Sequence, residues 1–297
     1  MPNQKLNLTP FFLVLTLLAS QAAPAADGGP VATASIPLRI DRFDYYKAEV
    51  MLDGKGPFRF MVDTGSAYSV LSTLTAALMR LRPDGSVSVQ SADGNPANGV
   101  LVEDYRSDLF DLHDEPMIVF PIYAQGVMGM RAFVGGRIEL DFFRKRMAFG
   151  PSGPAPAGYM TVKGTLGGTT SLIVDVIVDG VRAKALIDTG ARYTIGNPAL
   201  QAAMGFAPDD KRLRREDPIS DMSVRPTPAW KTRLGQLAIG DAVFPAPEVR
   251  FADMRAFGRL GLNDGPALIL GIDQLSRLKA MAIDYPRVEL QLLQIQR

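Results

Sequence analysis

Two short segments of the chain contain residue types that can carry out acid–base chemistry. Each has an aspartate directly after apolar residues, and threonine and glycine follow: Asp63-Thr64-Gly65-Ser66 in the first segment and Asp188-Thr189-Gly190-Ala191 in the second. A carboxylate at the end of a buried strand is poorly solvated. Glycine lets the backbone turn sharply, so that N–H groups approach the carboxylate and hold it.

Two such carboxylates brought face to face can hydrolyse an amide bond. They cannot both ionise easily, so they share one proton. One of them then acts as general base on a water molecule, and the other acts as acid toward the substrate carbonyl. If the two loops meet, Asp63 and Asp188 can form such a pair, and the hydroxyls of Thr64 and Thr189 can link the two loops.

The fourth residue of the motif differs between the two segments. Ser66 can donate a hydrogen bond to the first aspartate, whereas Ala191 has no donor in its side chain. Because a hydrogen bond to a carboxylate favours its ionised form, we expect Asp63 to be the more easily ionised partner.

The composition excludes several other kinds of site. The 297-residue chain has no cysteine, so disulfides, thiolate zinc sites and cysteine nucleophiles are excluded. His113 is the only histidine and has no nucleophile motif near it, which indicates a surface-loop residue. The net charge is +1 and the basic run Lys211–Arg215 is flanked by acidic residues, so we expect no nucleic-acid partner. We also expect no cofactor and no metal.

Residues 1–26 are typical of a secretory signal peptide. Lys5 supplies the positive charge, Phe11–Ala19 is an apolar run too short to span a bilayer comfortably, and Ala23-Pro24-Ala25 offers a cleavage pattern. An uncleaved anchor is the alternative. We expect an exported protein, periplasmic or secreted, with no stable membrane insertion after the signal is cleaved.

The chain contains one structural template twice. Ala48–Gly54 and Val174–Gly180 align position by position, alternate as half-buried strands do, and end in the Asp-Gly signal of a hairpin turn. Each precedes its Asp-Thr-Gly, and further on each copy has two apolar residues and a glycine, Val127-Met128-Gly129 and Ile269-Leu270-Gly271. Each copy then ends in a closing hairpin.

The two copies predict two lobes. Proline and glycine mark a linker at residues 151–158, between a first lobe at residues 27–150 and a second at residues 159–297. Short alternating segments dominate both, so we expect a mostly β protein. The few helix signals lie at Ser72–Arg80, Asn197–Met204 and Asp273–Leu278.

These motifs resemble the aspartic proteases, both the two-lobed pepsin-like enzymes and the retroviral-type proteases. The resemblance rests on the two Asp-Thr-Gly segments, their apolar-apolar-Gly partners and the closing segment Leu268–Tyr285. It implies two homologous β-rich lobes with a central cleft, an endopeptidase acting through Asp63 and Asp188, and a brace formed by Thr64 and Thr189. It also implies that each apolar-apolar-Gly element packs beneath its own aspartate loop, and that a monomer suffices to act on a peptide or protein substrate.

The family covers its site with a hairpin flap. Val87–Tyr105 fits such a hairpin, and Met222–Gly240 is its counterpart in the second lobe. Trp230 in this counterpart lies either in a flap over the cleft or in the lobe as a core or surface aromatic. Phe133–Glu139 in the first lobe leaves little room for the short helix that the second lobe keeps, so we expect no helix there.

Three functions are compatible with these residues. An exported aspartic endopeptidase is the leading hypothesis. The second is a catalytically weak or silent relative that binds peptides or an envelope polymer. The presence of both aspartates argues against this second hypothesis. The third is an interaction or scaffold protein in which Asp-Thr-Gly is only a structural turn.

Overall fold

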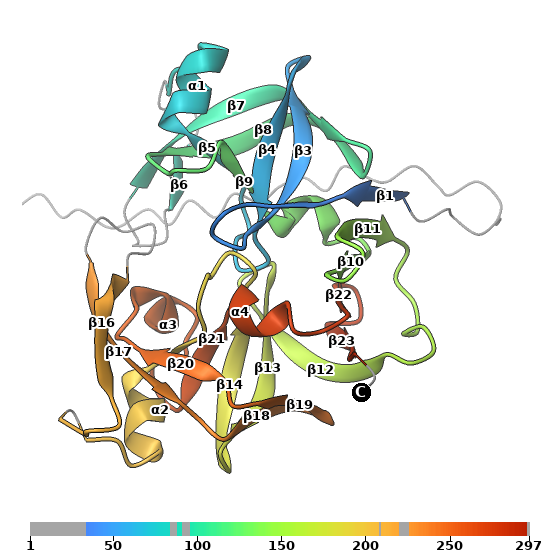
Figure 1. Cartoon of the computed structure of the whole chain (residues 1–297). Helices are drawn as coiled ribbons and strands as arrows, with labels where there is room; N and C mark the ends of the chain where they lie inside the picture. The colour runs from blue at the N-terminus through green and yellow to red at the C-terminus, as the bar shows by residue number, and fades with distance from the viewer. Residues whose placement is uncertain (1–33, 84–87, 91–95, 208, 220–225, 296–297) are drawn as a thin grey trace, which may run out of the picture. The chain divides into compact units, whose positions relative to one another are not determined.

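The computed structural model describes residues 34–83, 88–90, 96–207, 209–219 and 226–295 (Figure 1). These residues belong to one compact unit. The predicted signal peptide at residues 1–26 lies outside the described residues, as do the tips of both predicted flap hairpins. In the described ranges, no helix combines the length and the hydropathy that a bilayer crossing requires.

The described residues are mostly β-strand, as predicted, and their helices are short. The strands of the first half are β1 (Ala34–Pro37), β2 (Arg39–Ile40), β3 (Tyr46–Leu52), β4 (Lys55–Val62), β5 (Val70–Ser72), β6 (Ser88–Gln90), β7 (Pro96–Ser107), β8 (Phe110–Phe120), β9 (Gly126–Met128), β10 (Arg137–Asp141) and β11 (Arg146–Gly150). Those of the second half are β12 (Met160–Gly167), β13 (Ser171–Val178), β14 (Val181–Ile187), β15 (Ile195–Gly196), β16 (Arg214–Ile219), β17 (Thr227–Arg233), β18 (Gln236–Ile239), β19 (Ala242–Pro245), β20 (Glu248–Phe251), β21 (Ala267–Leu270), β22 (Ala280–Asp284) and β23 (Glu289–Leu293). The helices are α1 (Thr73–Met79), the 3₁₀ helix η1 (Met130–Phe133), α2 (Pro198–Ala203), α3 (Arg255–Arg259) and α4 (Ile272–Leu275).

Each aspartate of the two motifs directly follows the second strand of a hairpin. Strands β3 and β4 pair antiparallel in the first half, and β13 and β14 do so in the second. The turn residues Asp53 and Gly54 have φ angles of 46° and 71°, and Asp179 and Gly180 have φ angles of 46° and 85°. Positive φ at both central residues is the type I′ geometry that an Asp-Gly turn favours. Both predicted hairpins are therefore confirmed.

A third strand in each half lies beside the strand that leads to the aspartate. Strand β4 pairs in parallel with β9, and β14 pairs in parallel with β21. The N–H of Asp63 donates to the carbonyl of Met128 at 3.2 Å, and that of Asp188 donates to Leu270 at 3.1 Å. After β21, a Cβ on Gly271 would lie 2.6 Å from the backbone of the second aspartate loop, so only glycine permits this close approach.

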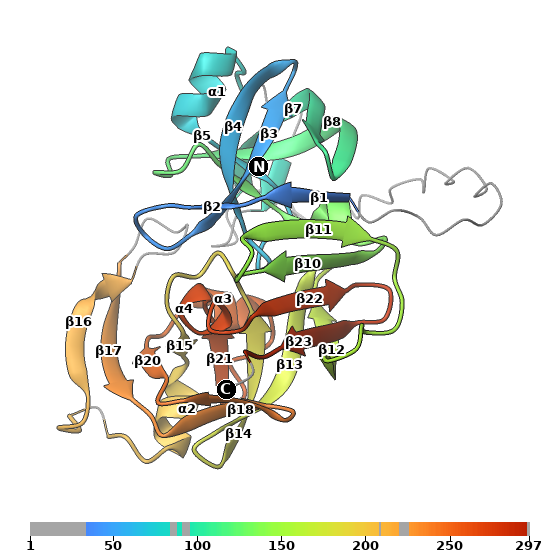
Figure 2. The ribbon, with the colours of Figure 1, turned by 45° about the vertical axis from the view of Figure 1, so that its right-hand side comes forward.

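A central sheet joins the two halves of the chain. Strand β10 from the first half pairs antiparallel with β22 from the second, from Arg137 opposite Asp284 to Asp141 opposite Ala280. The strand order through this region is β1-β11-β10-β22-β23-β12, which Figure 2 shows face on. The closing hairpins predicted for the two copies are therefore neighbours in one sheet. The other strands of the first half form a separate sheet in the order β2-β3-β4-β9-β5-β8-β7-β6.

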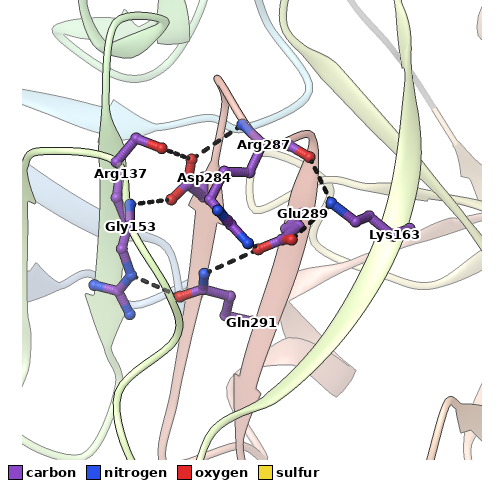
Figure 3. A network of polar contacts seen from close by, with 8 residues as sticks. Arg137, Gly153, Lys163, Asp284, Arg287, Glu289 and Gln291 are labelled. Carbon is purple, nitrogen blue, oxygen red and sulfur yellow. Dashed lines mark hydrogen bonds and ion pairs between the residues drawn. The ribbon is translucent and has the colours of Figure 1, made fainter.

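The segment predicted as a linker is fixed to the central sheet. Asp284 is fully buried, and its carboxylate accepts hydrogen bonds from the hydroxyl of Ser152 at 2.7 Å and from the N–H of Gly153 at 2.9 Å (Figure 3). The N–H of Arg287 donates to the same carboxylate at 3.2 Å. Because these donors satisfy a buried charge, the connection between the two halves is held in place.

The ion pairs of Glu289 should make the stability of the protein sensitive to acid. The Glu289 side chain is 3% exposed and contacts Lys163 at 2.7 Å and Arg287 at 3.0 Å. The hydrogen bond from Arg287 lowers the pKa of Glu289 to about 2, from an ordinary value of 4.5. A depressed folded-state pKa stabilises the protein fully above the ordinary pKa, and that contribution is lost as the pH falls toward about 2.

We therefore expect Glu289→Gln to lower the free energy of unfolding above about pH 4.5, with the difference from wild type shrinking toward zero near pH 2. Urea unfolding of both proteins across this range measures it. Glu49→Gln is the control, because Glu49 is 40% exposed and its ion pair with Arg39 is worth little. A Glu289→Gln penalty that does not change with pH would contradict the expectation.

Two predicted helices are confirmed together with their caps. Helix α1 is capped by Ser72, whose side chain accepts a hydrogen bond from the N–H of Thr75. Helix α2 is capped by Asn197 and has Pro198 in its first turn, where proline is favoured. The third, α4, begins at Ile272, just before its predicted start. Helix α3 was not predicted.

The expectation that the first half has no counterpart of α4 is wrong. The 3₁₀ helix η1 follows β9 after the single residue Gly129. The N–H groups of Met130 and Arg131 donate to carbonyls of the first aspartate loop at 2.9 and 3.1 Å, and these bonds begin the turn. The expectation was drawn from the segment Phe133–Glu139, but only the last residue of the 3₁₀ helix lies in this segment.

The hairpins predicted as flaps exist in part. Strands β6 and β7 pair antiparallel, as do β16 and β17. Trp230 is half-buried on β17, opposite Arg215 of β16 and Phe251 of β20, so it belongs to the sheet of the second half. His113 is exposed, as predicted, but lies on β8 rather than in a loop and bonds to Asp104 at 2.8 Å.

Candidate active site

The two Asp-Thr-Gly loops bind each other through their threonines. The N–H of Thr64 donates to Oγ1 of Thr189 at 3.1 Å, and the N–H of Thr189 donates to Oγ1 of Thr64 at 3.0 Å. Each hydroxyl donates to a carbonyl in the opposite half, Thr64 to Ile187 and Thr189 to Val62, both at 2.8 Å. Both threonines are buried, so these four bonds are shielded from water. We call Thr64 and Thr189 the threonine brace.

The two carboxyl groups lie against opposite loops. A Cβ on Gly190 would overlap the carboxyl group of Asp63, and a Cβ on Gly65 would lie 2.6 Å from Cγ of Asp188. Each glycine thus leaves room for the aspartate of the other half. Both aspartates are half-buried, so water can reach them. We call Asp63 and Asp188 the aspartate pair.

All the residues expected at the site lie together in the two loops. They are Asp63, Thr64, Gly65, Ser66, Asp188, Thr189 and Gly190. The contacts that join them cross between the two copies of the template, so neither copy forms this arrangement alone.

Backbone N–H groups hold both carboxylates. The N–H of Gly65 donates to Oδ1 of Asp63 at 2.9 Å. Oδ1 of Asp188 accepts two such bonds, from Gly190 at 2.9 Å and from Ala191 at 3.0 Å. Hydrogen bonds to a carboxylate stabilise its ionised form, and the backbone N–H of Ser66 also lowers the pKa of Asp63.

The two carboxyl groups accordingly differ in acidity. Burial raises the pKa of Asp63 well above its usual range, and the negative charge of Asp188 raises it further. Burial also raises the pKa of Asp188, but hydrogen bonds from Asp63 and from backbone N–H groups act in the opposite direction. The pair thus favours a state in which the two carboxyl groups share one proton.

The expectation that Asp63 ionises more easily loses its basis. It depended on a hydrogen bond from the Ser66 hydroxyl to Asp63, and this hydroxyl instead donates to the carbonyl of Tyr68 at 2.9 Å. The backbone N–H of Ser66 lowers the pKa of Asp63, and at the equivalent position the backbone N–H of Ala191 donates to Asp188 at 3.0 Å. The backbone N–H of Ala191 thus donates a hydrogen bond, which its side chain cannot do.

Two residues near the aspartate pair were not singled out from the sequence. Ser171 at the start of β13 donates its hydroxyl to the carbonyl of Gly65 at 3.3 Å. Tyr45 lies just before β3, where burial raises its pKa to about 12 and the negative charge of Asp188 adds to this rise. Extending the alignment of the two copies toward the N-terminus pairs Tyr45 with Ser171, so the repeat contained a signal for both.

Two copies of a β-rich template, each with an Asp-Thr-Gly loop beside a parallel apolar-apolar-Gly strand, define the fold of the aspartic proteases. The model of the aspartyl protease family matches residues 48–132 and 174–274, more than half of the chain. The chain belongs to the aspartyl protease family, and the predicted resemblance is confirmed. No curated protein matches the chain. Among solved structures, a retropepsin-like aspartic protease from Rickettsia conorii is similar, with 21% sequence identity and a TM-score of 0.34 over 46% of this chain and 89% of that chain.

Proposed function

We propose that the protein is an aspartic endopeptidase in which the aspartate pair activates a water molecule to hydrolyse peptide bonds. The observation that carries this proposal is the placement of Asp63 and Asp188 against each other's loops, half-buried and with unequal acidity. Family membership makes peptides the expected class of substrate. Since one chain supplies both aspartates, a monomer suffices.

The unequal acidity assigns a role to each carboxyl group. Ionised Asp188 accepts a proton from the water molecule as its oxygen attacks the substrate carbonyl, while protonated Asp63 donates its proton toward the carbonyl oxygen. The resulting tetrahedral diol collapses when the amide nitrogen receives a proton from Asp188, so the C–N bond breaks and a carboxylic acid and an amine form. A proton from the diol restores Asp63. The proton transfers thus balance, and the proposed mechanism uses no cofactor.

We also propose that the protein acts outside the cytoplasm, in the periplasm or after secretion. This rests on residues 1–26, which have the charge, apolar length and cleavage pattern of a signal peptide. Cell fractionation with an antibody to the second lobe tests it. A full-length chain found in the cytoplasm would contradict it.

Digestion of an unfolded protein tests the proposed activity. The purified protein is incubated with the substrate from acidic to neutral pH, with and without a pepstatin-like inhibitor, and the products are identified by mass spectrometry. Peptide products that the inhibitor suppresses support the proposal. Saturable peptide binding without cleavage at any pH would overturn it in favour of a peptide-binding relative.

The pH dependence of hydrolysis should follow the state with one shared proton. Because burial and the neighbouring charge raise the pKa of Asp63 well above 3.8, we expect activity to be lost only as the pH rises through an upper apparent pKa above that value. On the acid side, activity should fall when Asp188 is protonated as well. A profile of kcat/KM against pH measures both limbs, and activity that rises steadily with pH would contradict the shared proton.

A further inference from the structure

The two aspartate loops differ in charge at one position. Residues Tyr68 and Tyr193 occupy equivalent positions after the two glycines, but Ala67 in the first loop corresponds to Arg192 in the second. The guanidinium thus adds a positive charge to the second loop itself, while on the first side Cζ of Arg131, outside the loop, lies 5.8 Å from the ring centroid of Tyr68.

The side chain of Arg192 is held between two aromatic rings. Its guanidinium carbon Cζ lies 5.1 Å from the ring centroid of Tyr193 and 5.3 Å from that of Phe43. Phe43 is an exposed residue of the turn between β2 and β3, in the other half of the chain. Two aromatic contacts fix the side chain of Arg192 and reduce the entropy lost when a ligand binds to it.

The guanidinium acts in the same surroundings as the aspartate pair. The negative charges of Asp188 and Asp63 raise the pKa of Tyr45, and the positive charge of Arg192 lowers it. Burial is the largest cause of the shift for this tyrosine. Arg192 is half-buried and follows Asp188 by four residues in the same loop, so its charge lies close to the aspartate pair.

Among the described residues, Arg192 has no acidic partner. Arg250, which contacts the same tyrosine ring, does have acidic partners. Arg250 lies 3.4 Å from the ring of Tyr193 and is paired with Glu248 at 3.3 Å and Glu216 at 3.8 Å. An aromatic ring that contacts the face of a guanidinium attracts its charge but does not accept hydrogen bonds from the N–H groups in the guanidinium plane. The planar fork of N–H donors on Arg192 is thus free for a carboxylate.

We propose that Arg192 binds an acidic side chain of the substrate, Asp or Glu, next to the scissile bond. This inference rests on the proposed peptidase function and names the substrate class of the same site. Arg192 is then a specificity-determining residue, and the first loop has Ala67 at the equivalent position.

Binding of matched peptides tests the inference independently of cleavage. Asp63→Asn protein, which keeps peptides intact, is titrated with fluorescent peptides that carry a single Glu or Gln at successive positions. At one position, we expect the Glu peptide to bind about three- to tenfold more tightly, as a partly exposed charge pair does. The preference should vanish in Arg192→Ala, survive in Arg192→Lys in weakened form, and decrease with salt.

Two controls separate recognition from a structural contact between the halves. Arg42→Ala removes another cation that stacks on Phe43, at 4.7 Å, and should leave the preference intact. Phe43→Leu removes the aromatic contact but keeps the charge, so the Glu preference should persist. Equal weakening of Glu and Gln peptides in Arg192→Ala and Phe43→Leu would make Arg192 a structural link and overturn the inference.

Cleavage by the protein with its aspartate pair intact completes the test. We expect cut sites in an unfolded protein to be enriched in acidic neighbours, and Arg192→Ala to remove this enrichment. Cleavage without such enrichment, or enrichment that survives in Arg192→Ala, overturns the role of Arg192 and leaves the peptidase proposal standing. No cleavage with a persistent Glu preference in binding overturns the peptidase function instead.

Discussion

Asp188→Asn should lower the rate of peptide hydrolysis by a factor on the order of 10³ while leaving the fold intact. Asparagine has the same shape but cannot take a proton from water, and Asp188, which accepts two backbone N–H bonds, is the ionised partner in the proposed mechanism. Asp63→Asn should cause a loss of similar size, because in the proposed mechanism Asp63, whose pKa is raised, carries the proton that polarises the substrate carbonyl. Initial rates on one peptide substrate measure both losses.

An exposed aspartate provides the matched control for these variants. Asp175 on β13 is 81% exposed and, among the residues that the structure describes, pairs only with Lys184 at 2.7 Å, so Asp175→Asn should hydrolyse peptides at the wild-type rate. Circular dichroism and the melting temperature establish that the variants are folded. Activity that survives in Asp63→Asn or in Asp188→Asn would remove that residue from the catalytic pair.

Thr189→Val should destabilise the protein by about 2–5 kcal/mol and lower its activity together with its stability. Valine has nearly the same shape as threonine but lacks the hydroxyl that accepts from the N–H of Thr64 and donates to the carbonyl of Val62. Both partners would then be buried without a hydrogen bond, which is more costly than losing the bond alone. The relative position of the two aspartates depends on these same bonds.

Thr189→Ser is the matched variant for the threonine brace. Serine keeps the hydroxyl and loses only a buried methyl group, so we expect a loss of about 1 kcal/mol and nearly full activity. Urea unfolding followed by fluorescence measures the free energies, and hydrolysis is measured on the same samples. If Thr189→Val and Thr189→Ser have equal stability, the hydroxyl does not hold the two loops together.

The local structure around each aspartate could be predicted from the sequence because it depends on neighbouring residues. The Asp-Gly turns need positive φ at two adjacent positions, and the caps Ser72 and Asn197 act on N–H groups within the next turn of helix. The meeting of Thr64 and Thr189 could be anticipated for another reason. Two copies of one template that share a site must present the same residues to each other.

Other features depend on contacts that no local pattern specifies. The pairing of β10 with β22 joins two hairpins far apart in the chain, and either hairpin edge could pair with many strands. The rotamer of Ser66 was also undetermined, since its hydroxyl chooses between Asp63 and a carbonyl two residues away. In the sequence, Arg192 is only a difference between the two copies of the repeat. The ring of Phe43, which contacts Arg192, comes from the other half of the chain.

The central claim is that Asp63 and Asp188 work as one unit, and a double-variant comparison tests it most directly. The residual rate of peptide hydrolysis is measured for Asp63→Asn, for Asp188→Asn and for the protein with both substitutions. If the two carboxyl groups share one proton and one water molecule, the double variant should be no slower than the slower single variant. Losses that multiply would show two groups acting independently and would contradict the shared site.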